Sequence, residues 1–461
     1  MRMRRILTVA CVLCWCGSAW AETVAELRQR YNEAYLAVLA AASSVEASLG
    51  NVDSGFSYLT SCGWKVQSFA DKTKKLQTFY TLAENVTPSG RKVYLLTFKG
   101  STSKKDWGIN FQTGQVRFGG SSLAEMRRIA ALPSDESMPA VHGGFNFYTD
   151  HVLKSIVLDE TGTCLQGVFW EVLHSPNAVL ILAGHSLGGA VATLLGERLY
   201  DLGLPPERLK VITFGAPAIG NRAFAEQLGQ RLDLVRYTNT ADPVPGALQT
   251  VFGGYKQFGE NRKYHIDVSV NDSQHDSALY LDYAVSAYYK AMDALSGGLG
   301  RPVVQLEQMT AGVPKVGLVV FSSPEADKYK YVPDIRRFVT GQYLRTLPSY
   351  RLLRKDLDWD RSFASSKDIF DKAKQTGCEY VLFCGIDGHK ERNSKAWYVD
   401  LTQTLYTADH RLLTMGNYAR KVSPASGNIL AAGENLLLAK ADLRRALSFL
   451  RPQGRVNLLD D

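Results

Sequence analysis

One segment near the middle of the chain, from Ala178 to Leu195, reads AVLILAGHSLGGAVATLL. The apolar run at its start favours a buried strand, and the small and apolar residues at its end favour a helix. Between them lies Gly184-His185-Ser186-Leu187-Gly188, a G-x-S-x-G pattern. On a strand-to-helix turn this pattern presents the serine above a sheet, and the glycines avoid steric conflict. Ser186 is therefore a candidate nucleophile. The alternative is a run of small residues that only lets a helix pack on a strand.

A nucleophilic serine needs hydrogen-bond donors for the oxyanion that forms during attack. The backbone N–H of Leu187 meets this need, because it lies at the start of the predicted helix. A second donor is expected in an early loop. The predicted strand Lys92–Phe98 leads into Lys99-Gly100-Ser101, which makes Ser101 the candidate for this role.

The acid and the histidine of a catalytic triad should follow the serine in that order for a fold of this kind. Asp242 follows the predicted strand 234–239 and precedes a proline, although Asp-Pro is also an ordinary turn signal. His275 lies in a polar loop before a predicted helix, from which it can reach both partners. His265 lies on an apparent strand and is expected to make a structural contact instead. The ring of His185 is expected to point away from the site.

Predicted strands and helices alternate through this region, which argues for a mostly parallel sheet with helices on both faces. An amphipathic segment from Ser121 to Leu132 is either a lid or a surface helix. Another amphipathic helix is expected from Thr23 to Gly50, where Thr23 and Glu26 form a capping box.

Residues from about Leu95 to Leu281 resemble the class 3 lipases, which are the fungal-type triacylglycerol lipases and their bacterial relatives. The stretches that carry the resemblance include Phe98-Lys99-Gly100-Ser101, Asp106-Trp107, Val141-His142-Gly143-Gly144-Phe145, Gly184 to Ala190, Phe214-Gly215-Ala216-Pro217, Asp242-Pro243-Val244-Pro245, and His275 with Tyr280-Leu281. Two features depart from the family pattern. Lys99 stands where the family usually has arginine, and the spacing between Asp242 and His275 is short.

The resemblance implies an α/β-hydrolase fold and an ester hydrolase that forms an acyl-enzyme. The residues that it implies are Ser186, Asp242 and His275 as the triad, and Ser101 and Leu187 as the oxyanion hole. Esters of lipids, such as acylglycerols or phospholipids, or smaller esters are the implied substrates. No metal or organic cofactor is expected, since no cysteine or histidine spacing suggests a zinc site.

The first 21 residues have the pattern of a secretory signal. Arg2, Arg4 and Arg5 precede an apolar core, and Ala19-Trp20-Ala21 is a small-x-small cleavage site. Cleavage after Ala21 predicts a periplasmic or secreted protein, whereas an uncleaved membrane anchor is the alternative. No later stretch has the pattern of a membrane span, and nothing suggests nucleic-acid binding.

Four cysteines lie beyond this segment, at positions 62, 164, 378 and 384. An exported destination permits a disulfide between Cys62 and Cys164, and free buried thiols are the alternative. Cys378 and Cys384 lie on an apparent strand, which holds them too far apart to pair with each other.

A chain of 461 residues exceeds what one core usually supports, so two domains are expected. The composition break Ser296 to Pro302 predicts a first domain over 22–297, a linker over 298–314 and a smaller α/β domain over 315–452. Such a linker implies few contacts across the boundary. The second domain resembles the amino-terminal domain of TolB and related envelope modules, which implies docking to an envelope component. The alternative hypothesis for the whole chain is a non-catalytic envelope scaffold or binding protein with a hydrolase fold.

Overall fold

The computed structural model describes residues 22–49, 56–72, 77–100, 114–158, 165–250, 253–265, 273–329, 331–354, 363–392, 396–423 and 427–450. Its larger sheet has the strand order β1-β2-β3-β6-β7-β8-β9. The strands from β3 to β9 run parallel, and β1 and β2 form an antiparallel edge. Their bounds are β1 Lys65–Lys72, β2 Gln77–Val86, β3 Lys92–Phe98, β6 Ala178–His185, β7 Leu209–Phe214, β8 Asp233–Asn239 and β9 Glu260–Tyr264. The predicted α/β fold with a mostly parallel sheet is confirmed.

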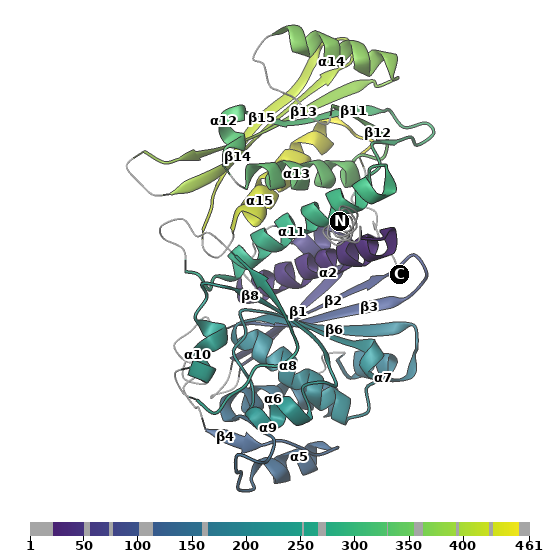
Figure 1. Ribbon diagram of the computed structural model, residues 1–461. Coiled ribbons are helices and arrows are strands. Elements are labelled where there is room, and N and C mark those ends of the chain that lie inside the picture. The colour runs from purple at the N-terminus through teal and green to yellow at the C-terminus, as the bar shows by residue number, and fades with distance from the viewer. Residues whose placement is uncertain are drawn as a thin grey trace, which may run out of the picture.

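Helices cover both faces of this sheet (Figure 1). One face carries α2 (Val24–Leu49) and α11 (Ser277–Leu299), and the other carries α6 (Gly143–Leu158), α7 (Leu165–His174), α8 (Leu187–Asp201) and α9 (Arg222–Gln227). Side chains alternate between the two faces, as strand geometry requires. Along β3, Val93 and Leu95 belong to the core under α2 and α11, whereas Tyr94 and Leu96 belong to the opposite core.

The predicted amphipathic helix after residue 22 is α2, and its capping box is present. The backbone N–H of Thr23 donates to Glu26 Oε2 at 2.7 Å, and the N–H of Glu26 donates to Thr23 Oγ1 at 3.2 Å. This helix lies along α11, where the hydroxyls of Tyr31 and Tyr288 are 3.0 Å apart.

The segment predicted as a lid or a surface helix contains α5 (Leu123–Ala130). It stands beside the small sheet of β4 (Gln115–Arg117) and β5 (Ala140–His142). Leu123 and Met126 point into the core. The guanidinium of Arg198, on α8, donates to Gly119 O at 3.0 Å and lies over the ring of Phe118. These contacts fix α5 against the helical layer, which favours the surface helix.

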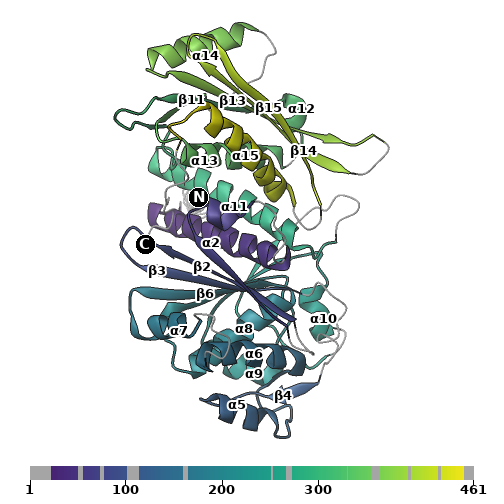
Figure 2. The ribbon, with the colours of Figure 1, turned by 180° about the vertical axis from the view of Figure 1, so that it is seen from behind.

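The C-terminal part builds a second, mixed sheet with the order β10-β12-β11-β13-β14-β15. Its strands are β10 Glu307–Gln308, β11 Val316–Ser322, β12 Tyr350–Arg354, β13 Tyr380–Lys390, β14 Trp397–Thr407 and β15 Leu412–Lys421. Its helices are α12 Pro324–Asp327, α13 Val332–Thr346, α14 Phe363–Gln375 and α15 Gly427–Ala446. Helix α14 covers one face, and α13 and α15 cover the other (Figure 2).

The two parts share one hydrophobic core. Helices α13 and α15 pack on α11, and buried side chains from both parts, such as Leu281, Phe338 and Leu436, belong to a single cluster. Between and including the two sheets, the layers are thus sheet, two helices, two helices and sheet, with further helices on the outer face of each sheet, as both views show. The expectation of few contacts across the boundary is wrong.

The glycine-rich break is misleading because α11 continues through it to Leu299. A methyl group on Gly298 would lie 2.5 Å from a methyl carbon of Leu27 on α2. This glycine therefore allows two helices to approach closely, and Gly300, at φ 63°, ends the helix.

Several sequence predictions fall outside the described residues. The predicted signal peptide (1–21), Ser101 and Cys164 are among them. Cys62, Cys378 and Cys384 are described as buried free thiols. None of the described helices has both the length and the apolar character needed to cross a membrane.

Candidate active site

Ser186 occupies a strained turn between β6 and α8. Its backbone has φ 57° and ψ −127°, and it is one of two residues other than glycine with a positive φ in the described chain. The structure holds this conformation through a hydrogen bond from the N–H of Ser186 to Phe214 O at 2.9 Å. Backbone strain of this kind persists only where the surroundings enforce it, and it is concentrated at functional sites.

Two glycines make the turn possible. A methyl group on Gly184 would lie 2.2 Å from the carbonyl carbon of Gly188, and one on Gly188 would lie 2.1 Å from Phe98 O. Neither distance is compatible with a side chain, so the backbone can pass on both sides of Ser186 only with glycine at these positions.

The structure brings Ser186, His275 and Asp242 into one hydrogen-bonded chain. His275 Nε2 lies 2.8 Å from Ser186 Oγ, and His275 Nδ1 lies 2.7 Å from Asp242 Oδ2. Because an ionised carboxylate only accepts hydrogen bonds, Nδ1 carries the proton and Nε2 is left to accept from the serine hydroxyl. The side chain of Asp242 is fully buried, whereas 16% of the His275 side chain is exposed.

Further donors hold the carboxylate of Asp242. The hydroxyl of Tyr280, one turn into α11, donates to Asp242 Oδ2 at 2.8 Å, and the N–H of Val244 donates to Oδ1 at 2.9 Å. The N–H of Asn239 in turn donates to the Tyr280 hydroxyl at 3.0 Å. Burial and the nearby Asp242 charge raise the pKa of Tyr280, which therefore stays a donor. Sequence reasoning did not assign Tyr280 this role, although a tyrosine on the apolar face of α11 signals a buried hydroxyl that needs a partner.

The expectation for His185 is wrong, because its ring lies beside the site. The centroids of the His185 and His275 rings are 4.5 Å apart. The reason is strand periodicity: Ile181 and Ala183 face α2 and α11, so His185 faces the same way. Burial, followed by the charge of His275, lowers the pKa of His185 well below its ordinary value. His185 is therefore a neutral ring packed against His275.

His265 lies just past β9, and its Nδ1 is 3.0 Å from Thr240 Oγ1. It makes the structural contact that the sequence predicts and is not part of the Ser186–His275–Asp242 chain. The backbone N–H of Leu187 begins α8, and no described residue accepts a hydrogen bond from it. Ser101, the other candidate donor, lies outside the described residues. The described part of the chain contains no cluster of three or more side chains suited to hold a metal ion.

Comparison with known proteins places this geometry in context. Residues 95–252 match the family model "Lipase (class 3)". This segment is therefore similar to the class 3 lipases. Phospholipase A(1) DAD1 from Arabidopsis thaliana is 30% identical over 175 residues, which cover 36% of this chain and 36% of that protein. Secreted mono- and diacylglycerol lipase A from Penicillium camembertii is 40% identical over 74 residues, which cover 16% and 24%.

The chain therefore spans about a third or less of the length of these two relatives. Among solved structures, the triacylglyceride lipase of Rhizomucor miehei is 22% identical, with a TM-score of 0.39, and the match covers 51% of this chain and 80% of that one. The matched segment, residues 95–252, ends before the second sheet begins. These matches do not support the predicted resemblance of the C-terminal part to TolB.

Proposed function

We propose that this protein is a serine hydrolase that cleaves carboxylic esters of lipids through an acyl-enzyme. The observation that carries the proposal is the chain of two short hydrogen bonds from Ser186 through His275 to Asp242, which begins on a strained turn. Each member has the position that acyl transfer requires of it. The match of residues 95–252 to the class 3 lipases supports the same conclusion.

In the first half of the reaction, Ser186 Oγ attacks the acyl carbonyl carbon while His275 Nε2 takes the serine proton. The imidazolium that forms is stabilised by Asp242, which keeps Nδ1–H oriented. The carbonyl oxygen gains a negative charge and accepts a hydrogen bond from the N–H of Leu187. The dipole of α8 adds to the stabilisation of this charge. Collapse of this intermediate breaks the ester bond, and the proton on Nε2 passes to the leaving alcohol.

In the second half, His275 Nε2 takes a proton from water, and the hydroxide attacks the acyl group on Ser186. A second tetrahedral intermediate then collapses, Ser186 Oγ regains its proton, and the carboxylic acid leaves. Acylglycerols and phospholipids are the proposed ester classes, because the names of the relatives include mono- and diacylglycerol lipases and phospholipases A1.

We also propose that the protein is exported, with cleavage after Ala21. The support is the sequence pattern of residues 1–21 alone. The mass and the N-terminal sequence of the protein recovered outside the cytoplasm test this proposal, and a mature chain that begins at Met1 contradicts it.

The test of the catalytic proposal compares the wild type with Ser186→Ala and with Ser43→Ala. Ser43 is a buried serine of α2 whose hydroxyl bonds Thr81 and Thr97, so it controls for loss of a buried hydroxyl. The expected result is hydrolysis of short p-nitrophenyl esters and of acylglycerol or phospholipid emulsions that is lost in Ser186→Ala only. Equal rates in Ser186→Ala and the wild type would contradict the hydrolase proposal and favour the non-catalytic scaffold instead.

A further inference from the structure

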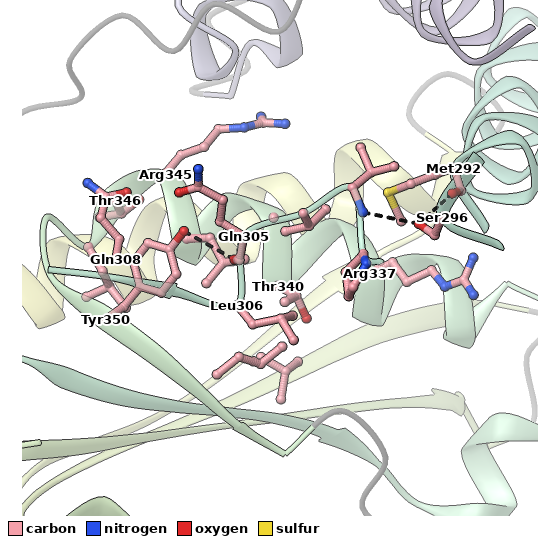
Figure 3. A pocket seen from close by; sticks show the side chains of 18 of the residues that line it. Met292, Ser296, Gln305, Leu306, Gln308, Arg337, Thr340, Arg345, Thr346 and Tyr350 are labelled. Atoms are coloured by element: carbon pink, nitrogen blue, oxygen red, sulfur yellow. Dashed lines mark hydrogen bonds between the residues drawn. The ribbon is translucent and has the colours of Figure 1, made fainter. Parts of the chain in front are cut away.

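A large pocket lies at the junction of the two parts, away from the proposed active site. Its volume is about 1970 Å³, and none of Ser186, His275 and Asp242 lines it. The C-terminal half of α11, the segment that follows it and α13 form much of the wall. Figure 3 shows Met292 and Ser296 at one end of this space and Arg345 and Gln305 toward the other.

The pocket is basic. Its charged lining residues are Arg28, Arg301, Arg336, Arg337, Arg345 and the single acid Asp293. Two of the arginines are neutralised locally. Arg337 pairs with Asp293 at 2.7 Å, and Arg336 lies 3.4 Å from Asp327. Arg301 and Arg345 have no acidic partner among the described residues, so an anion is the ligand that their charge favours.

Arg345 differs from these two arginines because it has no acidic partner among the described residues. Its Nη1 donates to Cys62 Sγ at 3.1 Å, and the side chain is partly exposed within the pocket that it lines. Its other electrostatic neighbours include Tyr35 and two tyrosines that also line the pocket, Tyr58 and Tyr288. A cation placed among neutral groups is costly unless an anion accompanies it.

A buried lysine close to Arg345 responds to the charge of this arginine. Lys440, on α15, is 5% exposed, and its ammonium donates to Gln342 Oε1 at 3.0 Å. No described carboxylate pairs with it. Burial, followed by the charge of Arg345, lowers the pKa of Lys440 to about 7. Lys440 therefore gives up its proton more readily than an ordinary lysine, as expected where no carboxylate balances the nearby Arg345.

The rest of the wall is suited to an acyl chain. Its aliphatic residues include Leu299, Val303, Val304, Leu306, Leu344 and Leu347. Leu344 and Leu347 are buried, whereas Val304 and Leu306 are 37% and 40% exposed. Apolar side chains left open to solvent beside a pocket are typical of a ligand-binding groove.

We propose that this pocket binds a long-chain fatty acid, with the carboxylate at Arg345 and the acyl chain along Leu299, Leu306 and Leu344. The guanidinium offers a planar pair of N–H donors that matches the two oxygens of a carboxylate. A neutral hydroxyl head group has one oxygen and no charge, so it pairs less well. The proposal concerns a site separate from Ser186, and it stands whether or not the chain hydrolyses esters.

The experiment measures displacement of a fluorescent fatty acid from the full chain. Palmitate should compete, the matching fatty alcohol should bind at least about tenfold more weakly because it has no charge, and acetate should not compete. Ser186→Ala should bind palmitate as the wild type does, which separates this pocket from the proposed active site.

Two arginine variants test the position of the head group. Arg345→Gln should weaken palmitate binding by about tenfold or more, because the positive charge that pairs with the carboxylate is lost. Arg337→Gln, which removes an arginine already paired with Asp293, should change the affinity by no more than about twofold. Equal binding by Arg345→Gln and the wild type, or binding of the alcohol as tight as that of palmitate, overturns the proposal.

The melting temperature separates binding from a structural role. If Arg345 serves a ligand, Arg345→Gln should melt no lower than the wild type in the absence of fatty acid, because an unpaired cation has been removed. A lower melting temperature with unchanged palmitate affinity would assign Arg345 to structure alone. If this variant fails to fold, a diazirine fatty acid can be photo-crosslinked to the wild type instead. The label should appear on residues within 292–313 and 336–350. Labels found only elsewhere contradict the proposal.

Discussion

The carboxylate of Asp282 accepts a hydrogen bond from the backbone N–H of Asn428 at 2.9 Å, so a side chain of α11 caps the first turn of α15. It also accepts from the N–H of Ile429 at 3.1 Å. The first turn of a helix has no internal partners for its N–H groups, and an acid there also meets the positive end of the helix dipole. Helix α11 therefore places Tyr280 at the candidate active site and Asp282 at the start of α15, which covers the second sheet.

Asp282→Ala should lower the free energy of unfolding by about 1–3 kcal/mol, because a cap is lost and buried N–H groups lose their acceptor. Asp293→Ala is the matched control on α11, since it removes an exposed ion pair with Arg337. That change should cost no more than about 1 kcal/mol. Urea unfolding of both variants measures the difference, and equal losses would show that the cap contributes little.

The contribution of Asp282 should depend on pH. Burial raises its pKa from the ordinary value to about 6, although the N–H groups of α15 act in the opposite direction. Between about pH 4 and about pH 6 the folded protein holds a proton that the unfolded chain has released, so this contribution to stability falls as the pH rises. The stability difference between wild type and Asp282→Asn should therefore shift against the wild type as the pH rises across this range. A constant difference contradicts the raised pKa.

Tyr280→Phe should lower kcat by about tenfold and leave KM nearly unchanged, because Asp242 loses a donor that orients it while the acyl site is untouched. Tyr283→Phe is the control, since Tyr283 lies on the same helix and its ring contacts Tyr264, 4.4 Å away. Steady-state kinetics on a soluble ester measure both parameters. An unchanged kcat in a folded Tyr280→Phe would show that the Val244 N–H is sufficient to hold Asp242.

His275→Ala should lower kcat by at least about 10³-fold, because the members of a triad act as a unit. His265→Ala removes the contact with Thr240, which lies outside the Ser186–His275–Asp242 chain, and should retain most of the activity. The comparison is made on the same soluble ester with circular dichroism to verify folding. Loss of activity in His265→Ala alone would reverse the assignment of the two histidines.

A truncated chain of residues 22–299 should be less stable than the full chain. Removing α13 and α15 uncovers the apolar face of α11, and each large side chain left exposed costs about 1.5–3 kcal/mol. The truncated chain should bind a dye that reports exposed apolar surface and should melt at a lower temperature. A melting temperature equal to that of the full chain, without dye binding, would mean that the shared core contributes little.

The sequence pattern predicted the elements whose apolar periodicity is strong. The run before Gly184 is β6, and Ser186 with its following helix has the expected strand-to-helix geometry. His275 could be preferred over His265 because a loop residue can reach a serine and an acid together. Strand β1, by contrast, was not predicted, since the described side chains of this edge strand are at least partly exposed and show no apolar alternation.

What the sequence could not reveal is which surface each apolar face covers. The periodicity of α11 shows that it is amphipathic, but it does not distinguish a helix covered on one side from one shared by two sheets. Composition misled in the same region, because Gly298 resembles a flexible linker residue although it serves close packing against Leu27. The orientation of His185 was missed because the strand extends to the residue directly before Ser186.

The shared core sets the order in which this chain can finish folding. Ser61 Oγ accepts a hydrogen bond from Gln342 Nε2 at 2.9 Å, although the two residues are 281 positions apart in sequence. Contacts of such separation slow folding, because a long loop must close before they form. During vectorial synthesis the segment 56–62, which packs on α13 and α15, thus has no permanent cover until these helices have emerged from the ribosome. A segment translated early in synthesis is therefore among the last to be buried.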